Sequence, residues 1–154
     1  IFTGDIQKDY ITNIQDLKPD LDKIQFVPLG LYDRNATLKF FKQDNDKYVS
    51  QSLESNMFGQ KYDLVDVVTL KDLMKKLNHD KIDVLKLDIE GSECAVLEQM
   101  LNEKIYPKYL CIEFDLLLKN KDVSNKTQNV VNNLLSVGYK MLKNDNFNIT
   151  FSRE

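Results

Sequence analysis

The sequence has few of the residues that build metal and disulfide sites. Its 154 residues include one histidine and two cysteines, so the ligands of a zinc site are lacking. His79 lies in a polar stretch after a predicted helix, which favours a surface or helix-end position over catalysis. Cys94 and Cys111 both fall in predicted buried elements. We therefore expect two free core thiols in a reducing compartment, the cytoplasm.

An excess of positive charge and long apolar runs are missing as well. The chain has 21 lysines and arginines against 24 aspartates and glutamates, a formal net charge of −3. Without a basic excess to neutralise phosphates, nucleic acid is not the expected partner. No apolar run is long enough to cross a bilayer. The length and composition instead predict one globular domain over residues 1–154.

Hydrophobic periodicity predicts strands and helices in alternation. A helix is expected at residues 8–17 and a long polar loop at 43–59. Further strands are predicted at 23–31, 36–41, 62–68, 82–87 and 109–114, further helices at 70–78, 94–101 and 125–137, and a final hairpin at 139–152. This alternation is typical of an α/β fold with a mostly parallel sheet, to which the C-terminal antiparallel hairpin adds an edge.

Local residues mark the ends of two of these helices. Thr69 and Asp72 form a Thr-x-x-Asp pattern, which predicts a capped N-terminus for the helix that follows. Ser124 is the expected cap of the helix at 125–137, and Gly138 is expected to end it.

The stretch "IDVLKLDIEGSE" places two carboxylates between an apolar strand and a helix. The strand at 82–87 is predicted to be buried on both faces, and Asp88, Glu90 and Gly91 follow it directly. One interpretation is helix capping, since acidic side chains ahead of a helix accept hydrogen bonds from its free N–H groups. The other is a ligand site, because parallel sheets bind ligands at the carboxyl ends of their strands. That edge would also collect Asp5, the Gly30 region and Glu113.

Residues 67–101 resemble the signature of the FkbM-type methyltransferases, V-x-T-L-D-x-L followed by I-D-x-L-K-I-D-I-E-G-x-E-x-x-V-L. The matching positions are Thr69, Leu70, Leu73, Ile82, Asp83, Leu85, Lys86, Asp88, Glu90, Gly91, Glu93, Val96 and Leu97. The stretches "VPLGLYDRNATLKFF" and "YLCIEF" are similar to the family's strand–turn–strand segment and to its later strand ending in glutamate.

The resemblance implies a class I methyltransferase, a Rossmann-like three-layer sandwich that binds S-adenosylmethionine. The family passes the methyl group to hydroxyl oxygens of sugars and small metabolites, so the implied partner is a hydroxylated small molecule. Asp88 and Glu90 match the motif that faces the methyl-transfer site, and Glu113 is a candidate for the acceptor side.

The resemblance also implies which residues bind the cofactor. Asp5 matches the acidic residue that binds the ribose, although the family usually has Phe-Glu-Pro there and this chain has Gly-Asp-Ile. Gly30 and Leu31 fall where the backbone contacts the adenine ring. Asp33 matches an aspartate of the following turn, where forming the turn is as good an explanation as recognising adenine.

One departure from the family concerns its first strand and the Gly-rich loop after it. The five glycines contain no such cluster, and the chain begins at what should be the second strand. The missing strand belongs in the middle of the sheet, where its loss leaves backbone groups unpaired. We therefore expect a fragment of a longer protein. Otherwise the strands close up directly, or a neighbouring chain fills the gap by strand addition.

Two other classes of function stay open at this point. The chain could be a non-catalytic relative, a binding or interaction module that has lost its cofactor. It could also be a hydrolase that uses Asp88, Glu90 and Glu113 as ligands of a hard cation, although no Lys or His is spaced to complete such a site. Substrate choice is expected in the loops at 43–59 and 116–124, whose composition does not identify the acceptor.

Overall fold

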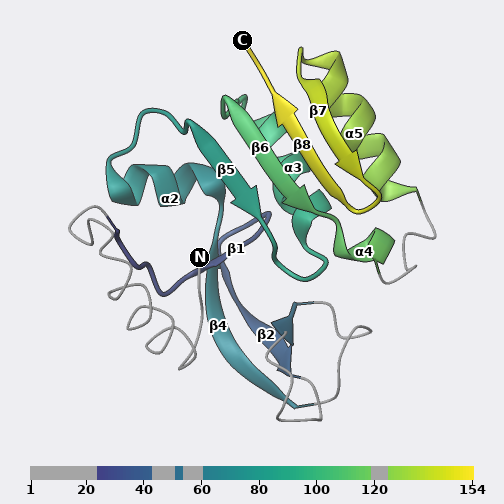
Figure 1. Ribbon diagram of the computed structural model, residues 1–154. Helices are drawn as coiled ribbons and strands as arrows, with labels where there is room; N and C mark the ends of the chain where they lie inside the picture. Colours follow the sequence, from purple (N-terminus) through teal and green to yellow (C-terminus); the bar gives the residue numbers. More distant parts are fainter. Residues whose placement is uncertain (1–23, 43–50, 54–60, 119–124) are drawn as a thin grey trace, which may run out of the picture.

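The computed structural model describes residues 24–42, 51–53, 61–118 and 125–154. Within these ranges helices and strands make a mixed α/β fold with two sheets (Figure 1). The predicted helix at 8–17, Asp5 and most of the predicted loop at 43–59 lie outside them. None of the helices in the described ranges is long and apolar enough to cross a membrane.

The N-terminal sheet has the strand order β1-β4-β2-β3. Its strands are β1 (Gly30–Leu31), β2 (Ala36–Lys42), β3 (Gln51–Ser52) and β4 (Tyr62–Val68). β1 runs parallel to β4, and β2 runs antiparallel to both β4 and β3. Two predictions are corrected here. The strand expected at 23–31 is limited to its last two residues, and the loop expected at 43–59 contains β3.

The C-terminal sheet has the strand order β5-β6-β8-β7. It consists of β5 (Val84–Leu87), β6 (Tyr109–Glu113), β7 (Lys140–Asp145) and β8 (Asn148–Ser152). β5 and β6 are parallel, whereas β8 runs antiparallel to β6 and to β7. The predicted C-terminal hairpin is therefore confirmed.

The described strand pairings do not make the expected mostly parallel sandwich. Of the six pairs, β1–β4 and β5–β6 are parallel and the other four are antiparallel. Each parallel pair lies in a different sheet, and no described strand joins β5 to the N-terminal sheet. β5 is consequently an edge strand among the described residues. The coarser prediction, a mixed α/β fold, is confirmed.

The described helices are α2 (Leu70–Leu77), α3 (Glu93–Asn102), α4 (Asp115–Leu118) and α5 (Lys126–Ser136). α3 and α5 contact each other and lie behind the C-terminal sheet in Figure 1, on one of its faces. Strand pairing places Leu110 beside Leu85 and Phe151, so one face of this sheet carries its large apolar side chains. These side chains and those of α3 and α5 form a single buried cluster.

β5 is buried on one face only. The prediction that this strand is buried on both faces is wrong for the described residues, because Val84 is 58% exposed and Lys86 is exposed, while Leu87 is buried. Alternate residues of a strand point to opposite faces. Leu87 therefore faces the core, and Val84 and Lys86 face away from it.

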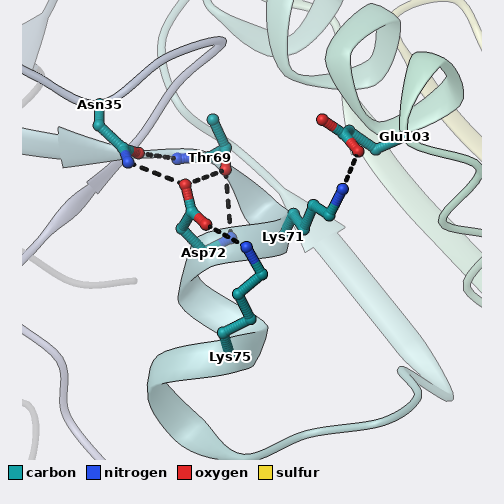
Figure 2. A network of polar contacts seen from close by, with 6 residues as sticks. All are labelled: Asn35, Thr69, Lys71, Asp72, Lys75 and Glu103. Carbon is teal, nitrogen blue, oxygen red and sulfur yellow. Dashed lines mark hydrogen bonds and ion pairs between the residues drawn. The ribbon is translucent and has the colours of Figure 1, made fainter.

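A polar network holds the turn after β1 against the start of α2 (Figure 2). Thr69 Oγ1 accepts a hydrogen bond from the backbone N–H of Asp72 at 3.1 Å, which confirms the predicted cap. Asn35, in the turn between β1 and β2, adds two hydrogen bonds. Its Oδ1 accepts from the Thr69 N–H at 3.0 Å, and its Nδ2 donates to Asp72 Oδ2 at 2.8 Å. The exposed His79 follows α2, as predicted.

The ends of α5 bear out one of two predictions. Gly138 follows the C-cap with a φ of +97°, a left-handed conformation that suits glycine, so this residue ends the helix as predicted. At the other end the N-cap is Asn125, which makes no side-chain capping bond. The predicted cap, Ser124, lies outside the described residues.

Candidate active site

The carboxylates of the Asp-x-Glu-Gly motif and of β6 emerge at one edge of the C-terminal sheet. β5 and β6 are parallel, and the last residues paired between them are Leu87 and Ile112. Asp88 and Glu113 come next on the two strands. Because parallel strands end at the same edge, these two side chains belong to neighbouring positions on it.

The pKa of Glu113 shows that the acidic side chains act on one another. Partial burial raises this pKa, and the negative charges of Asp88, Asp115 and Glu90 raise it further. Lys86 opposes them in part. Coulomb interactions of this kind fall off with distance, so Asp88, Glu90 and Glu113 lie near enough for their charges to influence one another. We call Asp88, Glu90 and Glu113 the carboxylate cluster.

Asp88 lies at the exposed side of the carboxylate cluster. Half of its side chain is exposed, and its Oδ2 lies 3.0 Å from Lys86 Nζ. The N-cap of α3 is Ser92, which makes no side-chain capping bond. Asp88 is therefore paired with a lysine of its own strand, and the interpretation that it caps the helix is wrong.

The turn that connects β5 to α3 has an unusual backbone. Glu90 and Gly91 have φ angles of +58° and +107°, both in the left-handed region. For a residue with a Cβ this conformation costs free energy, on the order of 1 kcal/mol, and needs support from its surroundings. Glu93 supplies that support. Its Oε1 accepts hydrogen bonds from the backbone N–H groups of Ile89 at 3.1 Å and Gly91 at 3.0 Å.

Glu93 is itself almost fully buried, at 1% exposure. Burial raises its pKa from 4.5 to about 7, and the negative charge of Asp115 raises it as well, against the hydrogen bonds from the backbone. The sequence reasoning assigned Glu93 no role in the site. A usable signal was present, because Glu93 precedes Val96 by three residues and Leu97 by four, so helical spacing places it on the apolar face of α3.

Three of the four residues expected to bind the cofactor have other contacts in the structure. A Cβ added to Gly30 would lie 2.8 Å from Val67 Cγ1, so glycine permits close packing of β1 on β4. Leu31 is 5% exposed and belongs to the core. Asp33 forms an exposed ion pair with Arg34 at 2.9 Å. Asp5 lies outside the described residues, so all four assignments stay predictions.

Two further features bear on what this edge can bind. Among the described residues, no three His, Cys, Asp or Glu side chains converge as metal ligands, so the geometry adds no support to the hydrolase alternative. A surface cavity of about 420 Å³ lies between α3 and α5, away from the carboxylate cluster. Its lining residues are Glu98, Leu101, Asn102, Asn133, Ser136 and Val137.

Comparison with known proteins gives one finding. The model of the family described as "Methyltransferase FkbM domain" matches residues 7–141, which is most of the chain and includes the whole carboxylate cluster. Searches of curated proteins and of solved structures find no match.

Proposed function

The chain belongs to the FkbM methyltransferase family, and on that basis we propose that it transfers a methyl group from S-adenosylmethionine to a hydroxyl oxygen of a sugar or small metabolite. The observation that carries this proposal is the carboxylate cluster at the carboxyl ends of β5 and β6, where partial burial and the neighbouring negative charges raise the pKa of Glu113. Methyl transfer is the property of the family. The donor and the class of acceptor are taken from the resemblance to the family, and the charge of the carboxylate cluster supports them.

The charge of the carboxylate cluster suits such a donor. S-adenosylmethionine carries a positive sulfonium, and when bound it supplies the methyl group and a neutral sulfide as leaving group. Three carboxylates with one opposing lysine, Lys86, leave an excess of negative charge at this edge. A cation placed there would relieve the repulsion between the carboxylates and would be attracted in turn.

The same carboxylates can prepare the acceptor. A hydroxyl oxygen becomes nucleophilic as it loses its proton, while a bond forms from this oxygen to the methyl carbon and the bond from carbon to sulfur breaks. A general base works best when its pKa is near the working pH, and the pKa of Glu113 is raised in that direction. We assign Glu113 to take the proton, and Asp88 and Glu90 to hold the hydroxylated substrate in line.

The cofactor assignments follow the resemblance. We propose Asp5 for the ribose hydroxyls, the backbone at Gly30 and Leu31 for the adenine ring, and Asp33 for the turn beside it. No metal is part of this proposal. We also propose the cytoplasm as the compartment, since Cys94 and Cys111 form no disulfide with each other.

Strand addition is the proposed route of any self-association. β5 is an edge strand in the part of the chain that the structure describes, and an exposed edge strand can pair with a strand of another copy. Light scattering across a range of protein concentrations measures this association. A mass that stays at that of one copy at every concentration would contradict it.

The proposal is tested with the full-length protein. Calorimetry with S-adenosylhomocysteine measures cofactor binding, and transfer of a labelled methyl group from S-adenosylmethionine to a panel of sugars and other hydroxylated metabolites measures the reaction. We expect binding heat, and label recovered as a methyl ether on one class of acceptor. Label recovered on nitrogen or carbon acceptors would contradict the assignment to oxygen.

The leading alternative is a non-catalytic binding module. It predicts no binding heat with S-adenosylhomocysteine and no transferred label, whatever the acceptor. The same calorimetry therefore separates the two functions before the acceptor is known.

A further inference from the structure

We propose that Glu93 is a positioning residue, whose buried carboxylate fixes the Ile89–Gly91 turn and thereby presents Asp88 and Glu90 at the edge of the sheet. The effect on the turn follows from geometry alone. The effect on catalysis rests on the proposed methyl transfer.

Glu93 connects the two sides of the turn through a pair of hydrogen bonds, which we call the brace. One carboxylate oxygen, Oε1, accepts from two backbone N–H groups, those of Ile89 and Gly91, which lie on either side of Glu90. Glu90 sits between them at a φ of +58°. Backbone N–H groups that donate to a carboxylate form charge-assisted hydrogen bonds, which are stronger than bonds between neutral groups. The two bonds therefore oppose relaxation of Glu90 to an ordinary conformation.

The burial of Glu93 argues against a role in surface solubility or simple helix capping. The side chain is 1% exposed, and its second oxygen, Oε2, is buried without a hydrogen-bond partner. A buried carboxylate is costly unless its contacts are needed, and an apolar residue would fill this position at lower cost. The carboxylate is used by the two bonds to the turn and by a bond from the backbone N–H of Glu93 itself.

The surroundings of Glu93 determine the pH range in which its carboxylate is charged. Asp115 on α4 is the charged side chain that raises its pKa, which is about 7. From α5 the neighbouring contact is uncharged, between Thr127 and Cys94 at 3.8 Å. α2 meets α3 through the ion pair of Lys71 with Glu103, at the far end of the helix. Ionised Glu93 accepts hydrogen bonds more strongly, so the brace is strongest above pH 7.

Two substitutions at Glu93 separate the acceptor from the charge. Glu93→Met keeps the volume and removes the acceptor oxygens, whereas Glu93→Gln keeps one acceptor oxygen and cannot ionise. Glu98→Gln is the matched control, because Glu98 is an exposed residue of the same helix. Amide hydrogen exchange and NMR shifts of Ile89 and Gly91 report on the turn. The Val96 amide, which donates to the Ser92 carbonyl at 3.1 Å, reports on the helix itself.

We expect Glu93→Met to lower the exchange protection of the Ile89 and Gly91 amides by about tenfold or more, with Val96 unchanged. In the same variant kcat for methyl transfer should fall about tenfold or more, while the KM for S-adenosylmethionine changes little. Glu93→Gln should keep the protection and lose the wild-type titration of both amide shifts near pH 7. Glu98→Gln should match the wild type throughout.

Each contrary result has a distinct meaning. Wild-type protection of Ile89 and Gly91 in Glu93→Met would overturn the brace, as would wild-type amide shifts that do not titrate between pH 6 and 8. Lost protection with unchanged kcat would overturn the positioning role. If the wild-type protein transfers no methyl group at all, the proposed function fails, and the amide data still decide whether Glu93 holds the turn. If Glu93→Met does not fold, the Glu93→Gln titration decides.

Discussion

The two sheets of this protein contribute to one core but differ in how much of their apolar surface is buried. Leu110 and Phe151, on the inner face of the C-terminal sheet, are fully buried under α3 and α5. In the N-terminal sheet Leu64 is 67% exposed and Tyr62 is 45% exposed, and a polar network at Asn35 ties the sheet to α2. The carboxylate cluster stands on the better packed of the two. Chemistry that needs fixed geometry is expected on such a rigid element.

The largest difference between the sheets should appear on removal of apolar side chains. Phe151→Ala leaves a large cavity in the core, and we expect it to lower the free energy of unfolding by about 3–5 kcal/mol. Leu64→Ala, at an exposed position of the N-terminal sheet, should change it by about 0.5 kcal/mol or less. Chemical denaturation of both variants measures the contrast. Equal losses would mean that the N-terminal sheet is packed as tightly as its partner.

A second contrast lies in the pH dependence of the free energy of unfolding. This dependence is expected from Glu93 on α3, which packs on the C-terminal sheet. The pKa of Glu93 is about 7 in the folded chain against 4.5 ordinarily, so the folded state holds its proton more tightly. The free energy of unfolding therefore falls as pH rises from 4.5 to 7 and stays low above 7. Glu93→Gln cannot ionise at this position and has no such loss. The free energy of unfolding of this variant, relative to that of the wild type, should therefore increase by about 3 kcal/mol from pH 4 to pH 8.

Denaturation of the wild type and Glu93→Gln across this pH range measures the gain as a difference, in which the other carboxylates cancel. A difference that is the same at pH 4 and pH 8 would show that the pKa of Glu93 is not raised. If the Glu93→Gln variant also loses the amide titration, the buried charge of Glu93 lowers the stability of the protein and at the same time holds the Ile89–Gly91 turn.

The smallest expected effect tests the polar link of the N-terminal sheet. Asn35→Ala removes two hydrogen bonds at an exposed position. The Asn35 Oδ1 accepts one from the Thr69 N–H, and the Asn35 Nδ2 donates the other to Asp72 Oδ2. We expect the melting temperature to fall by about 2–4 °C. Asn129→Ala, on the exposed side of α5, is the matched control and should leave the melting temperature unchanged or slightly raised. A fall in melting temperature no larger than that of the control would show that the polar network does not contribute to stability.

The predictions from sequence succeeded where a few neighbouring residues decide the structure. The capping pair Thr69 and Asp72 and the helix end at Gly138 need only local contacts, and both are confirmed. The carboxylates Asp88 and Glu113 were placed on one edge by strand order alone, and the structure brings them together. Local pattern and parallel pairing were enough for these.

The failures concern contacts between distant parts of the chain. The burial of β5 depends on what packs on each face of its sheet, and Val84 is exposed because it points to the face away from the core. The mostly parallel sheet was inferred from alternation, which does not determine pairing. Glu93 was overlooked because a charged residue is ordinarily a surface residue. Only its spacing to Val96 and Leu97 pointed inward.

The central claim is that Asp88 takes part in methyl transfer through its place in the carboxylate cluster. The most direct test compares kcat of Asp88→Asn with that of Asp83→Asn in the intact protein. Asp83 directly precedes β5, at its amino end, and pairs with Lys81 in an exposed ion pair. We predict that Asp88→Asn lowers kcat about a hundredfold with the fold intact, and that Asp83→Asn has wild-type kcat. Equal kcat for Asp88→Asn and the wild type would contradict the claim.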